Sequence, residues 1–349
     1  MSPSFRTLCL LLVGVIIPVL VNGALEVGFY NETCPQAEQL IFDAVSTAVT
    51  ANPGIAAGLI RMYFHDCFVR GCDGSVLLDS TADNQAEKDS PVNNPSLRGF
   101  EVIDEAKAAI EAVCPNTVSC ADVLAFAARD STSLTGGLNY TLPAGRRDGN
   151  VSIANETFSN LPPPSFNVTQ LVDNFAIKNL TLEEMVTLSG GHTIGRSHCT
   201  SFVSRLYNFS STSQVDPTLD ADYAATLQSL CPFNASTNNE TTVPMDVFTP
   251  DDLDVNYYVG VTQNFGLFTS DQTLLTNDST SALVEENIGS PDVWQARFAA
   301  AMIKMGDIEV LTGTDGEIRT NCRVVNSASS ASLIDTFGSS SSYSKVASS

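Results

Sequence analysis

Apolar residues recur at helical spacing, three and four positions apart, in several segments of this chain. The first segment is predicted to end at Cys114-Pro115, because proline cannot continue a helix. Its expected core face comprises Val102, Ile103, Ala106, Ala109, Ile110 and Val113. A second helix is predicted to begin at Ser119, which forms a capping pair with Asp122. Its apolar positions are Val123, Leu124, Phe126 and Ala127.

Two further helices follow from the same kind of pattern. Thr181 and Glu184 open one helix as a capping pair, and that helix is predicted to end at Gly190-Gly191. Its core residues are expected to be Met185, Val186 and Leu188. Ser290-Pro291 begins the other, which ends at Gly306, because proline is favoured in the first turn of a helix. The residues expected to face inward from it are Val293, Trp294, Phe298, Ala301, Met302 and Met305.

Signals for β-strands are scarce in this chain. A hairpin is predicted around Asp315-Gly316, between Val310-Leu311 and Ile318, because Asp-Gly tolerates the positive φ of a tight turn. Residues 24–326 contain no internal repeat and no clear linker. The length favours about two domains or one large two-lobed domain. The pattern as a whole predicts a mainly α-helical protein.

Both ends of the chain differ in composition from the rest. Arg6 precedes an apolar run from Leu8 to Val21, and the small residues of Asn22-Gly23 follow. This pattern predicts a secretory signal peptide over residues 1–23, because the run is short of the ~20 residues that a membrane span needs. A membrane anchor is the alternative. In residues 327–349, 11 of the 23 residues are Ser, so we expect a flexible end or a removable propeptide that carries sorting information.

The charge of the chain excludes some partners. Among 349 residues there are 17 Lys and Arg against 39 Asp and Glu, which gives a formal net charge of −22. Nucleic acid and anionic membrane surfaces would be repelled at long range by such a chain. Because 43% of the residues are hydrophobic, the chain has enough apolar material for a sizeable core. We therefore expect a folded acidic protein.

The cysteines and the glycosylation motifs agree with a secreted protein. One of the nine Cys, Cys9, falls in the predicted signal peptide, and the other eight form an even number, which favours four disulfides. Spacing alone leaves the pairing open. Ten Asn-x-Ser/Thr motifs permit N-linked glycans without proving them. They begin at Asn31, Asn139, Asn150, Asn155, Asn167, Asn179, Asn208, Asn234, Asn239 and Asn277.

The chain has only three histidines, so their neighbours are informative. His65 follows Arg61 by four residues, and on a helix this spacing places both side chains on one face, where they can converge on a small polar ligand. His192 follows Gly190-Gly191, where a turn could present it to a pocket. His198 has no such neighbourhood. Taken singly, each histidine is more often structural than catalytic.

Two longer motifs change this interpretation. The segment Phe64–Ser75 (FHDCFVRGCDGS) resembles the distal haem motif of the secretory plant (class III) peroxidases, and Leu188–Gly195 (LSGGHTIG) resembles their proximal motif. The resemblance extends from Phe29-Tyr30 and Cys34-Pro35 to the segment Asn321–Asn326. It implies the mainly α, two-lobed fold of these peroxidases, with haem between a distal and a proximal lobe, over residues 24–326.

The resemblance implies a non-covalent haem b, and the chain has no Cys-x-x-Cys-His attachment motif. His192 corresponds to the axial ligand of the haem iron, and Asp271 corresponds to the carboxylate that accepts a hydrogen bond from it. Such a carboxylate gives the imidazole partial imidazolate character, which stabilises ferric and higher oxidation states. The resemblance therefore places the cofactor on His192.

On the other haem face the resemblance gives His65 the role of general acid and base, taking a proton from one peroxide oxygen and delivering it to the departing one. Asn93 would support His65 through a hydrogen bond, Arg61 would stabilise charge on the leaving oxygen, and Phe64 would form the distal wall. The implied reaction reduces hydrogen peroxide to water through an oxyferryl haem radical. Two one-electron steps then oxidise phenolic donors to radicals.

The family's phenolic donors, including monolignol-like phenols, bind at the haem edge beside the residue that corresponds to Pro162. Ser165 and Ser201 stand where some relatives have aromatic residues. Fewer aromatic walls suggest a more open channel that binds small donors weakly and tolerates bulky phenols. The physiological donor itself is not specified by these residues.

The resemblance also implies two Ca²⁺ ions, one bound by a distal and one by a proximal set of residues. Both sets supply the hard oxygen ligands that calcium prefers. Without the family, each acidic cluster would be read as a solvated loop. The distal set is Asp66, Val69, Gly71, Asp73 and Ser75, with Glu87 joining through water. The proximal set is Thr193, Asp246, Thr249, Asp252 and Asp254. Because Thr193 follows His192 directly, the proximal ion would be coupled to the haem ligand.

The resemblance further implies a glycosylated monomer with a defined disulfide pairing, namely Cys34–Cys114, Cys67–Cys72, Cys120–Cys322 and Cys199–Cys231. The Cys120–Cys322 bridge closes a loop of about 200 residues, which should stabilise the fold by several kcal/mol in the loop-entropy model. The expected location is extracellular, in the apoplast. The vacuole is the alternative if the C-terminal tail is a sorting signal.

Two other kinds of function compete with a peroxidase. One is a catalytically silent, calcium-binding secreted glycoprotein of the same fold, which is disfavoured because all the residues with implied catalytic and haem-binding roles are present. The other is a zinc hydrolase that uses His65 and Asp66. Zinc sites usually need more His or Cys than three histidines and eight paired cysteines leave free.

Overall fold

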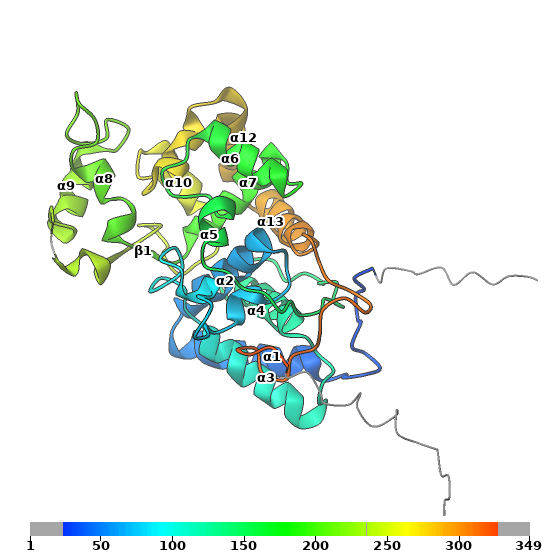
Figure 1. The fold of residues 1–349 in the computed structure, drawn as a ribbon. Helices are drawn as coiled ribbons and strands as arrows, with labels where there is room; N and C mark the ends of the chain where they lie inside the picture. Colours follow the sequence, from blue (N-terminus) through cyan, green and yellow to red (C-terminus); the bar gives the residue numbers. More distant parts are fainter. Residues whose placement is uncertain (1–23, 235, 327–349) are drawn as a thin grey trace, which may run out of the picture.

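The computed structural model describes residues 24–234 and 236–326, and within these ranges the chain is mainly helical. The predicted signal peptide and the Ser-rich tail lie outside the described residues. Four helices pack together at the base of Figure 1, with α4 against α1, α2 and α3. Their bounds are Ala37–Ala51 (α1), Ile55–Val69 (α2), Phe100–Val113 (α3) and Cys120–Leu134 (α4).

A second group of helices forms the other lobe, above the first in Figure 1. In it α7 packs against α6, α12 and α13, and α10 packs against α12 and η3. The bounds are Val168–Ile177 (α6), Leu182–Ser189 (α7), Gly190–Thr193 (η3), Asn256–Thr262 (α10), Thr269–Gln272 (α11), Thr273–Leu275 (η6), Asp278–Gly289 (α12) and Pro291–Met305 (α13). The short elements Ser75–Leu77 (η1) and Glu87–Asp89 (η2) lie between α2 and α3 in the chain, and Glu156–Asn160 (α5) lies between α4 and α6.

A third, smaller group, which we call the satellite, spans residues 196–244 and lies to the left in Figure 1. It is built around a second hydrophobic cluster, which also includes Leu267 of the second lobe, and it is closed by the Cys199–Cys231 disulfide. Arg205 ties it to the second lobe by donating hydrogen bonds to the carbonyls of Gly266 (2.6 Å) and Leu267 (2.8 Å). Its elements are Arg196–His198 (β1), Cys199–Ser201 (η4), Val203–Leu206 (α8), Ala221–Leu230 (α9), Ser236–Asn239 (η5) and Thr242–Pro244 (β2).

The four predicted helices are confirmed, together with their ends. Ser119 caps α4 by accepting a hydrogen bond from the Asp122 backbone, and Thr181 with Glu184 forms a full capping box on α7. Pro291 stands in the first turn of α13. Two core assignments were wrong: Val113 is 52% exposed and Val293 is 45% exposed. Val113 lies in the last turn of α3 and Val293 in the first turn of α13.

The predicted hairpin around Asp315-Gly316 was also wrong. Gly316 does adopt a positive φ of 68°, but its two flanking arms do not pair with each other. Instead, Arg147 pairs with Leu311 and Asp148 pairs with Glu317 as isolated bridges. The segment at 147–148 therefore lies between the arms and takes the hydrogen bonds that a hairpin would use. The strand pair found in the described residues is β1–β2, antiparallel, with Arg196 opposite Pro244.

All four disulfides pair as the family resemblance implied: Cys34–Cys114, Cys67–Cys72, Cys120–Cys322 and Cys199–Cys231. A fully buried ion pair adds to them, because Arg146 donates to Asp122 on α4 at 2.8 Å. The second carboxylate oxygen of Asp122 accepts from the Tyr30 hydroxyl at 2.7 Å. These links join the chain's beginning and end to α4. Among residues 24–234 and 236–326, no helix is long and apolar enough to cross a membrane.

Candidate active site

Helix α2 carries five of the predicted site residues, namely Arg61, Phe64, His65, Asp66 and Val69. Arg61 and His65 lie one turn apart on it, as their spacing predicted. Close packing positions this helix: a Cβ on Gly58 would lie 2.7 Å from the carbonyl oxygen of Arg98. The Arg61 guanidinium donates to Ser96 Oγ at 3.0 Å and to the Val92 carbonyl at 3.3 Å. Within the described residues it has no carboxylate within 4 Å, so its positive charge faces the site without a counter-ion.

His65 and Asn93 are hydrogen bonded in the structure, with 2.6 Å between Nδ1 and Asn93 Oδ1. The Asn93 amide is oriented by its own Nδ2, which donates to the Glu87 carbonyl at 2.8 Å. Burial and the charge of Arg61 lower the pKa of His65 well below its usual range, although the hydrogen bond to Asn93 acts to raise it. The ring is therefore neutral near pH 7, and its Nε2 can accept a proton. The Phe64 ring packs edge-on against it at 5.5 Å.

His192 lies in η3, directly after α7. Its Nδ1 is 2.7 Å from Asp271 Oδ1, and Asp271 is 1% exposed. Close packing requires the glycine before this turn, because a Cβ on Gly190 would lie 2.6 Å from the hydroxyl of Tyr258. The imidazole is 41% exposed, and its Nε2 makes no hydrogen bond to the described residues. One ring nitrogen is thus held by a buried carboxylate, while the other is available to a ligand.

The predicted distal calcium ligands form a buried acidic cluster below α2. Asp66 accepts hydrogen bonds from the backbone of Gly74 at 2.9 Å and Val76 at 3.2 Å. Both carboxylate oxygens of Glu87 are buried without a hydrogen-bond partner among the described residues, and so is Ser75 Oγ. Burial, and then the charges of Asp66 and Asp73, raise the pKa of Glu87 well above its usual range. This arrangement is costly unless a cation or donor compensates it.

The loop that carries this cluster is held tightly. The Cys67–Cys72 disulfide closes it, and Cys72 donates its backbone N–H to the Ile308 carbonyl at 3.0 Å. Val69 is the last residue of α2, and the carbonyl of Gly71 accepts from the backbone of Asp73 at 2.8 Å. The loop therefore brings the side chains and backbone carbonyls of the predicted distal set into one short segment.

The predicted proximal calcium ligands also come together, around Thr193. Its Oγ1 lies 3.0 Å from Asp254 Oδ1, 3.2 Å from Asp246 Oδ2 and 3.4 Å from the Asp252 carbonyl oxygen. Thr249 Oγ1 lies 3.3 Å from the same Asp246 oxygen. In the part of the chain that the structure describes, no three His, Cys, Asp or Glu side chains form a metal cage by themselves. Both sets consequently depend on hydroxyl and backbone oxygens as well as carboxylates.

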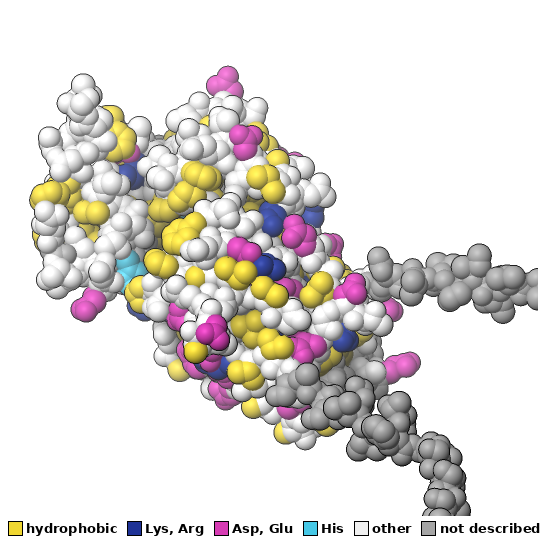
Figure 2. All heavy atoms as spheres, viewed as in Figure 1, with side chains coloured by type: hydrophobic (Ala, Val, Ile, Leu, Met, Phe, Trp, Pro, Cys, Tyr) yellow, Lys and Arg dark blue, Asp and Glu magenta, His cyan; other side chains and the backbone are white. Residues whose placement is uncertain are grey.

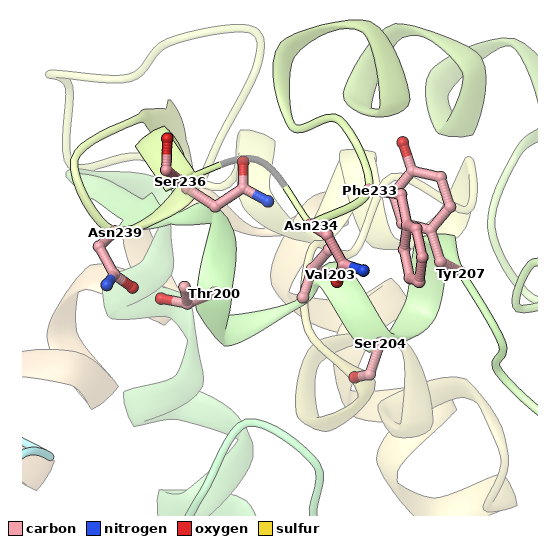
Figure 3. A pocket seen from close by; sticks show the side chains of 9 residues that line it. Thr200, Val203, Ser204, Tyr207, Phe233, Asn234, Ser236 and Asn239 are labelled. Carbon is pink, nitrogen blue, oxygen red and sulfur yellow. The ribbon is translucent and has the colours of Figure 1, made fainter.

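The predicted donor residues lie on two separate segments. Pro162 is half-buried after α5, whereas Ser165 and Ser201 are exposed. A different part of the satellite holds a cavity of about 440 Å³, where the rings of Tyr207 and Phe233 lie together at 5.2 Å (Figure 3). None of the residues predicted to act in catalysis lines that cavity. Figure 2 shows few charged side chains on the satellite in this view.

The structure is that of a helical protein in which His65 and His192 are each hydrogen bonded to a buried side chain, and its sequence is similar to those of known proteins. The family model described as peroxidase matches residues 41–290. Peroxidase 5 of Vitis vinifera is 59% identical over 324 residues, which cover 93% of this chain and 98% of that protein. Peroxidase 1 of Zea mays is 52% identical, covering 94% of this chain and 89% of its own. Peroxidase 3 of Arabidopsis thaliana is 48% identical, covering 90% and 96%.

This chain belongs to the plant (class III) peroxidase family. It is a peroxidase, and the mainly helical fold agrees with that assignment. Members of the family contain haem, use hydrogen peroxide with small-molecule donors, and are secreted. The family predicted from the sequence is therefore confirmed.

Several residues of the site escaped sequence analysis. Tyr257 donates its hydroxyl to Asp271 Oδ1 at 3.1 Å, and the Phe268 backbone donates to Asp271 Oδ2 at 2.7 Å. Arg98 lies near enough to Arg61 for the charges to interact, and burial together with Arg196 lowers the pKa of Arg98. A pattern of apolar positions gives no sign of these contacts.

Proposed function

We propose that this peroxidase oxidises small phenolic donors with hydrogen peroxide at a site between His65 and His192. The observation that carries the proposal is the pair of oriented histidines: His65 held by Asn93 at 2.6 Å, and His192 held by Asp271 at 2.7 Å. A pair of this kind supplies a neutral base on one side and a strongly donating ligand on the other.

Observations on both lobes fit a haem at this site. The exposed His192 ring keeps Nε2 available for the iron. The loop after it touches α2, because a Cβ on Gly195 would lie 2.8 Å from Ala57 Cβ. The charge of Arg98 acts on Arg61 and that of Arg196 acts on Arg98, with Asp251 as an acidic neighbour of Arg98, and haem carboxylates would add further anions to this group of cations. When bound, haem iron supplies the redox chemistry that amino-acid side chains lack.

The side chains of the distal face would then handle the proton and the charge. His65 takes a proton from one oxygen of hydrogen peroxide at Nε2 and returns it to the departing oxygen, while Asn93 keeps Nδ1–H in place. Arg61 stabilises the negative charge that develops on the departing oxygen, because its guanidinium has no carboxylate partner among the described residues. Phe64, whose ring packs against the buried ring of Phe68 at 4.3 Å, would limit access of bulky donors to this face.

Phenolic donors would bind beside Pro162, with Ser165 and Ser201 leaving the route open. Both serines are exposed, which supports the idea of a channel with few aromatic walls. Such a channel would bind small phenols weakly and admit bulky ones. Because the donor gives up one electron at a time, weak binding at the edge is sufficient for the reaction.

Two Ca²⁺ ions would occupy the distal and proximal sets. The distal set is supported by the Glu87 carboxylate and the Ser75 hydroxyl, which have no hydrogen-bond partner among the described residues, and the proximal set by the three acceptor groups around Thr193. Calcium would offset the repulsion within each cluster. Because Thr193 adjoins His192, loss of the proximal ion would loosen the position of the haem ligand.

The secreted protein would be a glycosylated monomer of the apoplast, and a vacuolar location would follow if the tail were a sorting signal. All ten predicted sequon asparagines are exposed, which leaves each accessible to glycosylation. Mass spectrometry before and after glycan removal, with determination of the mature C-terminus, identifies the occupied asparagines and the fate of residues 327–349. Localisation of a tail-deleted form separates the two compartments.

The proposal is tested with purified holoprotein by adding hydrogen peroxide and following the haem absorption band and the oxidation of guaiacol. His65→Leu is expected to lower the rate with peroxide by roughly 10²- to 10⁴-fold, and the control His198→Leu to leave it within about 3-fold. His198 lies on β1, outside the proposed site. A band that does not respond to peroxide would favour the silent glycoprotein. Equal loss in both variants would refute the role of His65.

A further inference from the structure

Asp271 is the acceptor of three hydrogen bonds, and two of them end on the same oxygen. Oδ1 accepts from His192 Nδ1 at 2.7 Å and from the Tyr257 hydroxyl at 3.1 Å. Oδ2 accepts from the backbone N–H of Phe268 at 2.7 Å. Asp271 is 1% exposed and Tyr257 is 4% exposed, so water does not compete for these bonds. No Lys or Arg is paired with this carboxylate among the described residues.

We propose that Tyr257 is a positioning residue that sets, through Asp271, how strongly His192 donates electrons to the iron. A hydroxyl that bonds to Oδ1 spreads part of the negative charge of that oxygen. The oxygen then pulls less on the proton of His192 Nδ1, and the imidazole keeps less imidazolate character. Tyr257 thus limits the effect of Asp271 and keeps the ferric state from being stabilised too far. The inference rests on the proposed role of His192 as the iron ligand.

The effect of the Tyr257 hydroxyl on His192 can be separated from the effect of the packing of the Tyr257 ring. Its ring meets the His192 ring edge to face, at 5.9 Å between centroids and 84° between planes, and Phe268 meets His192 in the same way at 5.6 Å. A phenylalanine at 257 keeps the ring and these contacts and removes only the hydroxyl. The change in electron donation therefore comes from one hydrogen bond.

The neighbouring residue offers a matched control. Tyr258 stands next to Tyr257 in α10 and is also fully buried, but its hydroxyl donates to the backbone carbonyls of Val186 at 2.8 Å and Thr187 at 3.2 Å. Tyr258→Phe thus removes a buried hydroxyl of the same kind without touching Asp271. A purely structural role for such a hydroxyl would give the same result in both variants.

The experiment measures two properties of the purified haem-loaded variants that do not depend on turnover. These are the ferric/ferrous midpoint potential by spectroelectrochemistry and the iron–imidazole stretching frequency of the ferrous form by resonance Raman. Tyr257→Phe is expected to shift the potential to a more negative value and the frequency to a higher one. Tyr258→Phe is expected to leave both unchanged while lowering thermal stability to a similar extent.

A double variant completes the test. When Asp271→Asn has removed the carboxylate, adding Tyr257→Phe is expected to cause no further shift in the potential, because the two residues act through one oxygen. The inference is overturned if Tyr257→Phe leaves the potential unchanged, shifts it positively, or shifts it as much as Tyr258→Phe does. It is also overturned if the shift persists in the Asp271→Asn background.

Failure of this inference is distinguishable from failure of the proposed function. In His192→Gly, the proposed function predicts loss of the iron–imidazole band, and addition of free imidazole is expected to restore it. If that band is unaffected by His192→Gly, the ligand assignment is wrong and the inference falls with it. If the band responds but Tyr257→Phe has no effect, only the role of Tyr257 is refuted.

Discussion

Replacing Glu87 with glutamine is expected to stabilise the calcium-free protein and to reduce the stabilisation that calcium adds. In the described structure, Glu87 is fully buried and neither carboxylate oxygen has a hydrogen-bond partner. It also lies near two further buried carboxylates, those of Asp66 and Asp73, whose charges act on it. Without a cation this group is destabilising, whereas with calcium it contributes to binding.

The size of the effect follows from what the side chain lacks. A buried polar group without its hydrogen bonds costs about 1–3 kcal/mol, and glutamine brings an amide N–H that can donate to the neighbouring carboxylates. Glu87→Gln should therefore stabilise the calcium-free protein by about 2 kcal/mol, or raise its Tm by roughly 4 °C. In the presence of calcium, loss of one negative charge should weaken ion affinity about tenfold, or about 1.4 kcal/mol.

The assay is thermal unfolding of the secreted, disulfide-intact protein after chelation and after readdition of calcium. The increase in Tm on adding calcium should be smaller in Glu87→Gln than in the original protein, because ligand binding stabilises the folded state in proportion to affinity. Glu105→Gln, on the exposed side of α3, serves as the control for a simple loss of charge. The reasoning is refuted if Glu87→Gln destabilises both forms alike, or if calcium leaves the Tm of the original protein unchanged.

Three other outcomes are expected. Asn93→Ala should lower kcat/KM for hydrogen peroxide by about 10²-fold, because the distal histidine loses the partner that orients it; a change under about 3-fold in stopped-flow kinetics would contradict this. Ser165→Phe should lower the KM for guaiacol ~3-fold by supplying one aromatic contact, and weaker binding in steady-state assays would contradict the open-channel proposal. Although burial acts to raise it, the pKa of Asp216 lies below the usual 3.8 because Thr218 and Arg205 donate hydrogen bonds to it. The ionised Asp216 carboxylate therefore stabilises the folded state above pH 3.8, and this stabilisation is lost as the pH falls through the lower pKa of the folded state. The difference in Tm between the original protein and Asp216→Asn should consequently shrink only in strong acid.

Much of the chemistry could be predicted because it lies in continuous sequence motifs. Arg61, Phe64, His65 and Asp66 share one helix, so their spacing alone places them together. The disulfides could not be paired by spacing, and only the family resemblance predicted the arrangement that the structure has. Motifs therefore gave local geometry, while long-range pairing required a known relative.

What was missed depends on contacts between distant segments. The hairpin prediction at Asp315-Gly316 was wrong although its local turn signal is correct. The segment at 147–148 forms the hydrogen bonds that the two arms of the hairpin would have made with each other. Val293 has the spacing of a core residue but lies in the first turn of α13, beyond the packing surface. Tyr257 is fourteen residues from Asp271, and no local pattern distinguishes it from the adjacent Tyr258. Tertiary packing decides these cases.

The satellite has a consequence for how proteins of this architecture can diverge. Within the described residues, its hydrophobic cluster contains no residue of α4 or α7, but it includes Leu267 and packs against Phe265 and Phe268, which belong to the second lobe. The satellite also carries Ser201, one of the residues proposed to border the donor route. Substitutions on the exposed surface of the satellite could therefore change the donor route alone, whereas substitutions in its hydrophobic cluster would also act on Phe268, which contacts His192 and donates to Asp271.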